Sequence, residues 1–249
     1  MNQEEFNQII KKIKEKKELS AIDSQFVKKE LDNYLKQYPK ISFNPRSQHY
    51  KKLIKEVRAI LRRTYGLFRF NIKGSKDLLA EHPSTKERLS FYPQLYKQIF
   101  QITGTPKTIL DLGCGVNPLS MKYMDLTNLT YYAYDLSKEE INFLNQFFNG
   151  KGQAKVLDLL HFKTLPKADL AFLFKMTDVL DRGKGHKNTE AVLKKISAKY
   201  VIVSFPTLTM SGKKMNFPRR KWIELLCERL NYEYQILEFS NEIFYVIKK

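Results

Sequence analysis

Apolar residues recur at three- and four-residue intervals through the first third of the chain, which is the pattern of amphipathic helices. The pattern predicts three or more helices before residue 75, with apolar faces formed by Phe6, Ile9, Ile10, Ile13, Phe26, Leu31, Tyr34, Leu35, Leu53, Ile54, Val57, Ile60 and Leu61. A further helix is expected within residues 82–100, where Ser84 and Glu87 have the spacing of a capping box.

From Lys107 onward, short apolar runs of β-prone residues alternate with helical stretches. The runs occupy residues 108–113, 130–136, 154–160, 168–175, 200–206, 234–239 and 242–248. Five strands separated by helices, followed by two closely spaced strands, predict a doubly wound α/β sheet with an antiparallel terminal hairpin. Such a terminal pair is typical of S-adenosylmethionine-dependent methyltransferases and atypical of dehydrogenases. We therefore expect a Rossmann-like class I methyltransferase domain at residues 76–249, preceded by an all-helical domain at residues 1–75.

The chain is strongly basic, and its charge is concentrated near the N-terminus. Its 44 Lys and Arg residues against 26 Asp and Glu residues leave a net charge of +18, of which residues 1–75 carry +10 (18 basic and 8 acidic residues). Basic runs on single helices also occur as plain solvated faces. An excess of this size nevertheless favours a polyanionic partner. Nucleic acid is favoured over a membrane, because no stretch approaches the roughly 20 consecutive apolar residues of a membrane span.

The remaining composition excludes several kinds of site. The N-terminus lacks the basic-then-apolar order of a secretory signal, so we expect a cytoplasmic protein. Cys114 and Cys227 form neither a disulfide framework nor a zinc-ligand spacing. The four histidines are scattered, and surface or capping roles are expected for them. No metal site is predicted.

The segment LDLGCGVNPLS, residues 110–120, has the form of a cofactor loop. A strand that ends in Asp-x-Gly-x-Gly lets the backbone approach a ligand without interference from Cβ atoms. The third glycine of dinucleotide-binding loops is replaced here by Asn117 and Pro118. This argues against NAD or FAD and favours a nucleoside without a pyrophosphate, such as S-adenosylmethionine. A plain turn between a strand and a helix is the alternative.

Two aspartates follow at the ends of the next two predicted strands. Asp135 lies about 20 residues beyond the glycine loop, where a carboxylate can accept hydrogen bonds from both ribose hydroxyls. Asp158 ends the third strand, where its carboxylate or the adjacent Leu159 backbone could meet the adenine amine. Either aspartate could instead cap a helix. Because ligands lie across the carboxyl ends of the strands in open α/β sheets, the loop and both carboxylates are expected to converge.

The sequence lacks the motifs of two common methyl-transfer chemistries. The fourth strand ends in FLFKMTD, without the Asn/Asp-Pro-Pro-aromatic motif of enzymes that methylate exocyclic amines. Neither cysteine is well placed to be the nucleophile that pyrimidine C5 methylation requires. A ring nitrogen with a free lone pair, such as guanine N7, needs only positioning and desolvation.

Six blocks of the sequence together resemble a specific family. HPSTKERLSFY, ILDLGCGVNPLSMKY, AYDLSKEEINFL, FLFKMTDVLDR, VIVSFPTLTMSGKKM and NEIFYVIKK are similar, in order and spacing, to the 16S rRNA (guanine-1405, N7) methyltransferases that confer aminoglycoside resistance. The resemblance extends from about His82 to the C-terminus and is looser before it. It implies methylation of guanine 1405 in the decoding region of the assembled 30S subunit, with the N-terminal domain docking on rRNA. A monomer is expected.

The resemblance also implies roles for individual residues. Arg88 resembles the residue that holds the methionine carboxylate. Lys175 resembles a lysine of the pocket, and Met215 resembles a methionine that contacts the flipped guanine. Lys175 and Met215 are thus the catalytic candidates. A surface lysine and a packing methionine are the alternatives for these last two. The implied cofactor contacts are Arg88, Asp111, Gly113, Gly115, Asn117, Asp135, Asp158, Leu159 and Lys175.

One loop departs from the family pattern. The segment 207–222 is shorter than in the family, lacks the glycine before Met215 and has Asn216 in place of a glutamate. Two alternatives therefore stay open: a methyltransferase of the same fold that acts on another RNA site, and a non-catalytic ribosome-binding or assembly factor. The intact glycine loop, Asp135 and Arg88 count against the second.

Overall fold

Three helices and a short 3-10 turn build the N-terminal region of the computed structural model, which describes residues 3–20, 22–39, 43–64, 77–181, 185–209 and 212–249. The elements are α1 (Gln3–Lys14), η1 (Lys17–Leu19), α2 (Ser24–Gln37) and α3 (Gln48–Thr64). Every apolar position predicted to face inward lies in their common core or packs against it. The helical periodicity of the sequence is thereby confirmed. The domain boundary expected between residues 75 and 76 lies outside the described residues.

Between residue 77 and the first strand, the described chain forms three helices, α4 (Leu78–Glu81), α5 (Pro83–Lys86) and α6 (Tyr92–Thr103). The predicted capping box is wrong. Since Pro83 begins α5, the position before the helix is His82, and Ser84 already lies inside the first turn. The Ser84 hydroxyl lies 3.3 Å from His82 Nδ1, and Glu87 forms an ion pair with Lys175.

The sheet contains β1 (Thr108–Leu112), β2 (Thr130–Asp135), β3 (Gly152–Val156), β4 (Ala168–Phe174), β5 (Ala198–Pro206), β6 (Glu233–Glu238) and β7 (Glu242–Lys248). Their order is β3-β2-β1-β4-β5-β7-β6. The first five strands are parallel, whereas β7 is antiparallel to both β5 and β6. The predicted class I methyltransferase sheet with its antiparallel terminal hairpin is confirmed.

Helices cover both faces of this sheet, because alternate residues of each strand point to opposite sides. On one face, α6 and α7 (Lys138–Phe148) pack against residues such as Ile109 and Phe172. On the other face, α8 (Thr177–Asp181), α9 (Lys187–Lys195) and α10 (Lys221–Arg229) pack against residues such as Leu110 and Ala171. A 3-10 helix, η3 (Asn117–Tyr123), follows the glycine loop. Among the described residues, no helix is both long and apolar enough to cross a bilayer.

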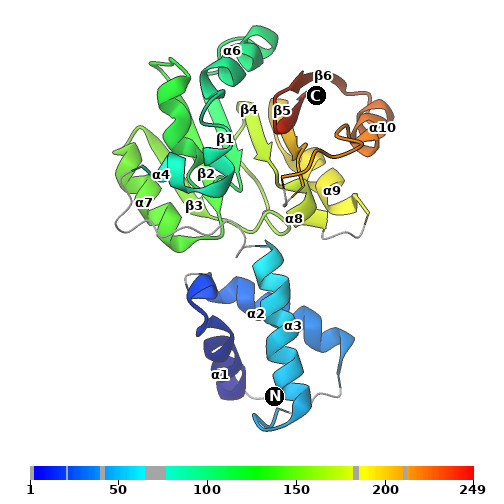
Figure 1. The fold of residues 1–249 in the computed structure, drawn as a ribbon. Coiled ribbons are helices and arrows are strands. Elements are labelled where there is room, and N and C mark those ends of the chain that lie inside the picture. The colour runs from blue at the N-terminus through cyan, green and yellow to red at the C-terminus, as the bar shows by residue number, and fades with distance from the viewer. Residues whose placement is uncertain (1–2, 21, 40–42, 65–76, 182–184, 210–211) are drawn as a thin grey trace.

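The carboxyl ends of the parallel strands meet at one edge of the sheet, and the N-terminal helices lie against this edge (Figure 1). Ile22, just before α2, forms an isolated antiparallel bridge with Ser137, just after β2. Helix α3 packs on α8, which follows β4. The fold therefore brings the basic helices next to the loops in which the site residues were predicted.

Candidate active site

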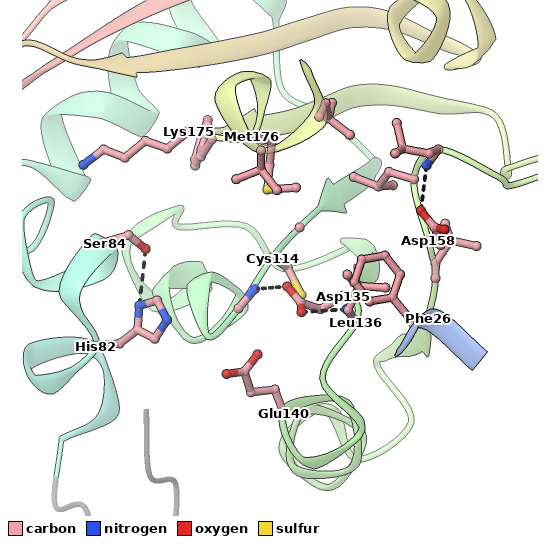
Figure 2. A pocket seen from close by; sticks show the side chains of 18 residues that line it. Phe26, His82, Ser84, Cys114, Asp135, Leu136, Glu140, Asp158, Lys175 and Met176 are labelled. Carbon is pink, nitrogen blue, oxygen red and sulfur yellow. Dashed lines mark hydrogen bonds between the residues drawn. The ribbon is translucent and has the colours of Figure 1, made fainter. Parts of the chain in front are cut away.

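A pocket lies at the carboxyl edge of the sheet, between the loops that follow β1, β2, β3 and β4 (Figure 2). Six of the ten predicted site residues line it: Gly113, Gly115, Asp135, Asp158, Leu159 and Lys175. The other four, Arg88, Asp111, Asn117 and Met215, do not line the pocket. The convergence of the glycine loop with the two aspartates is therefore present in the structure.

The floor of the pocket is backbone, because its two glycines adopt conformations that disfavour side chains. Gly113 has a φ of +75° and Gly115 a φ of +49°, both in the left-handed region. A Cβ atom on Gly113 would lie 2.2 Å from Met176 Sδ, and one on Gly115 would lie 3.3 Å from His82 Nε2. A ligand on this floor would thus contact main-chain atoms directly, which is the arrangement expected of a nucleoside-binding loop.

Asp111 and Asn117 support the loop from behind. The Asn117 side-chain amide donates a hydrogen bond to Asp111 at 2.8 Å and accepts one from the Tyr92 hydroxyl at 2.7 Å. The Tyr131 hydroxyl also donates to Asp111, at 2.7 Å. Burial raises the pKa of Asp111 to about 6, although the hydrogen bonds from Asn117 and Tyr131 oppose the rise. Both residues support the glycine loop and neither lines the pocket, so their predicted contact with the cofactor stays a prediction.

Asp135 is held by backbone donors on both sides of the pocket floor. Its Oδ2 accepts from Gly115 N at 2.9 Å, and its Oδ1 accepts from Leu136 N at 2.6 Å and Ser137 N at 3.1 Å. Burial raises the pKa of this carboxyl, and the three backbone hydrogen bonds limit the rise. The backbone therefore fixes the orientation of the carboxylate, and its predicted contact with a ribose stays a prediction.

Asp158 lies two residues beyond the end of β3, at the same end of the pocket as Leu136 (Figure 2). Its Oδ2 accepts from Lys29 Nζ and from His161 Nδ1, each at 2.9 Å, and its Oδ1 accepts from Leu160 N at 3.0 Å. Burial would raise the pKa of Asp158, but the contacts with Lys29, Leu160 and His161 outweigh it and lower the pKa. Asp158 is an ionised, oriented acceptor.

Arg88 belongs to a buried charge network beside the pocket. Arg88 is 1% exposed, and its guanidinium donates to both oxygens of Glu242, with distances of 2.8–3.1 Å. Burial opposes the charged form of Arg88, but the ion pair with Glu242 outweighs it and raises the pKa. The proposed contact of Arg88 with a methionine carboxylate stays a prediction.

Lys175 extends this network to the opposite end of the pocket from Asp158 (Figure 2). Its Nζ forms an ion pair with Glu87 and lies 3.4 Å from Glu242 Oε2. Its backbone has a φ of +56°, which is uncommon for a residue with a side chain, and its N–H donates to Ser204 Oγ at 3.0 Å. Two cations and two carboxylates thus balance in charge at this end of the pocket.

Met215 lies on the loop between β5 and α10, away from the pocket lining. Its sulfur lies 3.3 Å from Arg220 Nη2, and the same guanidinium donates to the carbonyls of Pro206, Phe217 and Pro218. Arg220 therefore braces this loop against the end of β5. The contact of Met215 with a target base also stays a prediction.

Comparisons with known proteins identify the family of the chain. The sequence profile of a family described as ribosomal RNA methyltransferase (FmrO) matches residues 8–246. The 16S rRNA (guanine(1405)-N(7))-methyltransferase of Micromonospora rosea is 29% identical over 189 residues, which cover 72% of this chain and 67% of the relative. The protein of the same name from Serratia marcescens is 30% identical over 182 residues, 70% of each chain.

The chain belongs to the FmrO family of ribosomal RNA methyltransferases. Its fold is also that of the 16S rRNA methyltransferase RmtF, solved in complex with S-adenosyl-L-homocysteine, with a TM-score of 0.79 at 23% identity over 100% of this chain and 99% of that one. The expectation of an S-adenosylmethionine-dependent rRNA methyltransferase is confirmed at the level of the family.

The structure of this FmrO-family member adds pocket residues that the sequence analysis missed. His82, assigned a surface or capping role, is buried and lines the pocket with Ser84. Phe26 of the N-terminal region also lines it. His82 lies in the first of the six family-like blocks, which was a signal for it, whereas nothing local in the sequence of α2 distinguishes Phe26 from its other apolar residues.

The two thiols are unsuited to nucleophilic chemistry. Both are buried, and burial raises the pKa of Cys114 well above its usual value and that of Cys227 to about 11. A thiol needs its thiolate form to attack a pyrimidine. In the described part of the chain, no group of three or more His, Cys, Asp or Glu side chains is arranged to hold a metal ion.

The buried ion pair predicts a large stability effect. Replacing Glu242→Gln leaves the Arg88 charge without its counter-charge, and removing one partner of a buried pair costs about 3–5 kcal/mol. Glu233→Gln is the matched control, because Glu233 pairs with Lys248 at 2.7 Å on the surface. An exposed pair contributes at most about 1 kcal/mol. Urea unfolding should separate the two variants, and equal midpoints would contradict the assigned role of Glu242.

Proposed function

We propose that this chain transfers a methyl group from S-adenosylmethionine to N7 of a guanine in 16S rRNA of the assembled 30S subunit, at guanine 1405, and so gives aminoglycoside resistance. The observation that carries the proposal is the single pocket into which the glycine loop, Asp135 and Asp158 converge. The relatives named for this reaction support its target.

The pocket suits the cofactor residue by residue. The glycine floor carries no side chains of its own, and Met176 and His82 pack so close to it that a Cβ atom on Gly113 or Gly115 would crowd them. Asp135 would accept the ribose hydroxyls and Asp158 with Leu159 would flank the adenine, while Lys175 lies at the other end. When bound, S-adenosylmethionine supplies an electrophilic methyl group on a sulfonium.

The chemistry left to the protein is alignment and exclusion of water. Guanine N7 carries a lone pair and no proton, so the attack needs no general base. The transfer moves one positive charge from the sulfonium to the guanine ring without changing the total. Lys175 and Arg88 are already neutralised by Glu87 and Glu242, so the cationic product meets no unpaired cation at these four residues.

Two surfaces favour RNA as the partner. On α3, Lys51, Lys52 and Lys55 are exposed, and among the described residues no carboxylate lies within ion-pair distance of them. On the loop before α10, Phe217 is 84% exposed and is flanked by lysines and arginines. An exposed aromatic ring among cations is suited to stacking on an unpaired base. We infer that residues 1–75 form the rRNA-docking domain, which acts as part of a monomer.

Asp135 gives the first test, on the cofactor. Asp135→Ala removes a carboxylate whose hydrogen bonds to the ribose would contribute about 2–4 kcal/mol, so S-adenosylmethionine should bind at least tenfold more weakly in calorimetry. Asp169→Ala is the matched control, since Asp169 accepts the N–H groups of Lys107 and Thr108, at the start of β1. Equal cofactor affinity of the Asp135 variant and the wild type would refute the assignment.

A charge-removal series tests docking. The triple change Lys51→Gln, Lys52→Gln, Lys55→Gln should weaken binding to 30S subunits and reduce the slope of log affinity against log salt by about 0.7–0.9 for each phosphate that these lysines neutralise in the wild type. The control removes the same charge elsewhere, with Lys97→Gln, Lys151→Gln and Lys155→Gln, all exposed residues of the sheet domain. If both triple variants lost affinity equally, docking would not be local to the N-terminal helices.

The product itself tests the reaction and its site. Incubation of 30S subunits with the protein and labelled cofactor should yield 7-methylguanine, whose imidazolium ring is opened by borohydride and cleaved by aniline. Primer extension on treated 16S rRNA should then stop at guanine 1405, and expressing cells should resist gentamicin and kanamycin. The Asp135→Ala protein is the control. A stop at another guanine would overturn the site, and a methyl group on an adenine or a pyrimidine would overturn the reaction.

A further inference from the structure

We propose that helix α2 of the N-terminal region forms the outer wall of the adenosine end of the cofactor pocket, with Phe26 covering the base and Lys29 holding Asp158. Cofactor binding and the placement of the RNA-docking helices are therefore coupled. The inference rests on the proposed function, because it takes the pocket to be the S-adenosylmethionine site. It adds two residues from outside the methyltransferase sheet to that site.

The first observation is the position of Phe26. Phe26 is 6% exposed and lines the pocket, although it belongs to the core of the N-terminal helices. Figure 2 shows the ring beside Asp135 and Leu136, at the same end of the pocket as Asp158. A flat apolar ring next to the carboxylates expected to hold ribose and adenine provides a surface on which a purine can stack.

The second observation is the regular spacing of contacts along α2. Asp23, which caps the helix, forms an ion pair with Lys138 at 2.7 Å. Phe26 lines the pocket, and Lys29 forms an ion pair with Asp158 at 2.9 Å. Ile22 bridges to Ser137 just before them. Positions 26 and 29 lie one turn apart on one face of the helix, and positions 22 and 23 directly precede its first residue. This face runs from the end of β2 to the loop after β3.

The contact of Lys29 with Asp158 is oriented and partly buried. The side chains are 28% and 22% exposed, and Lys29 shares Asp158 Oδ2 with His161. Asp158 Oδ1 takes the Leu160 N–H and has a further lone pair. Lys29 thereby aims the carboxylate so that Oδ1 is the oxygen available to an exocyclic amine of adenine.

The coupling follows from how α2 is packed. Residues of α1, α2 and α3 share one buried core, and the exposed lysines of α3 lie on the outside of it. A cofactor that binds against Phe26 therefore also favours one placement of the docking helices. By linkage, bound cofactor must raise the affinity for the 30S subunit by the same factor by which the subunit raises the affinity for cofactor.

The test measures S-adenosylhomocysteine affinity by calorimetry on the full chain. Phe26→Ala should bind S-adenosylhomocysteine at least tenfold more weakly than the wild type, because a phenyl ring no longer covers the base. Phe26→Leu should recover part of the lost affinity. Lys29→Gln should bind severalfold more weakly. The matched control is Lys28→Gln on the same helix, since Lys28 lies over the Phe6 ring, and its affinity should equal that of the wild type.

A second measurement distinguishes a loss of the orientation of the Asp158 carboxylate from a general destabilisation of the protein. S-inosylhomocysteine lacks the exocyclic amine, so the wild type should prefer S-adenosylhomocysteine. Lys29→Gln should reduce this preference, whereas mere destabilisation would weaken the binding of both ligands equally.

A third measurement tests the coupling to the 30S subunit. The ratio of the 30S dissociation constants without and with S-adenosylhomocysteine should exceed one in the wild type. It should fall towards one in Phe26→Leu and Lys29→Gln.

The outcomes are distinguishable from failure of the proposed function. If Phe26→Leu and Lys29→Gln bind S-adenosylhomocysteine as the wild type does, the inference is wrong, while methylation of 16S rRNA by the same proteins would leave the proposed function intact. If the wild type itself does not bind S-adenosylhomocysteine, the proposed function fails and the inference with it. Should Phe26→Ala lose its thermal transition, the Phe26→Leu and Lys29→Gln measurements decide.

Discussion

The Asp135 carboxylate ties the loop after β1 to the end of β2, and the geometry of the pocket depends on this tie. Gly115 donates to the carboxylate, and the N–H groups of Gly113 and Cys114 both donate to the Tyr134 carbonyl. The loop can fold back onto the neighbouring strand in this way only with positive φ angles at its two glycines. A backbone floor and an oriented carboxylate result from the same set of hydrogen bonds.

Charge neutralisation shapes the opposite end of the pocket. Arg88 and Glu242 are almost completely removed from water, which is costly for either charge alone and tolerable for a bidentate pair. Lys175, held in a left-handed backbone conformation, adds a second cation and reaches a second carboxylate, Glu87. The result is a charge-balanced network of two cations and two carboxylates, of which Lys175 lines the pocket.

The two parts of the chain meet at the functional edge of the sheet. Parallel strands place all their carboxyl ends together, and the N-terminal helices cover the ends of β2 and β3 with α2. The basic N-terminal helices and the pocket are thereby built on adjoining elements. This arrangement is the structural basis of the proposal that one protein presents both a docking surface and a reaction centre to rRNA.

The sequence by itself determined the elements and the edge at which the site would form. Periodicity identified the N-terminal helices and the seven strands, and the glycine pair with Asp135 and Asp158 identified the loops, because these signals are local and depend on backbone chemistry. The capping box predicted for Ser84 and Glu87 is wrong, because the helix begins at Pro83. The sequence analysis also did not assign His82 and Phe26 to the pocket. Only the tertiary structure decided that Arg88 pairs with Glu242 and Lys29 with Asp158, pairs separated by 154 and 129 residues. Such contacts depend on how distant elements pack, and no local pattern of side chains encodes them.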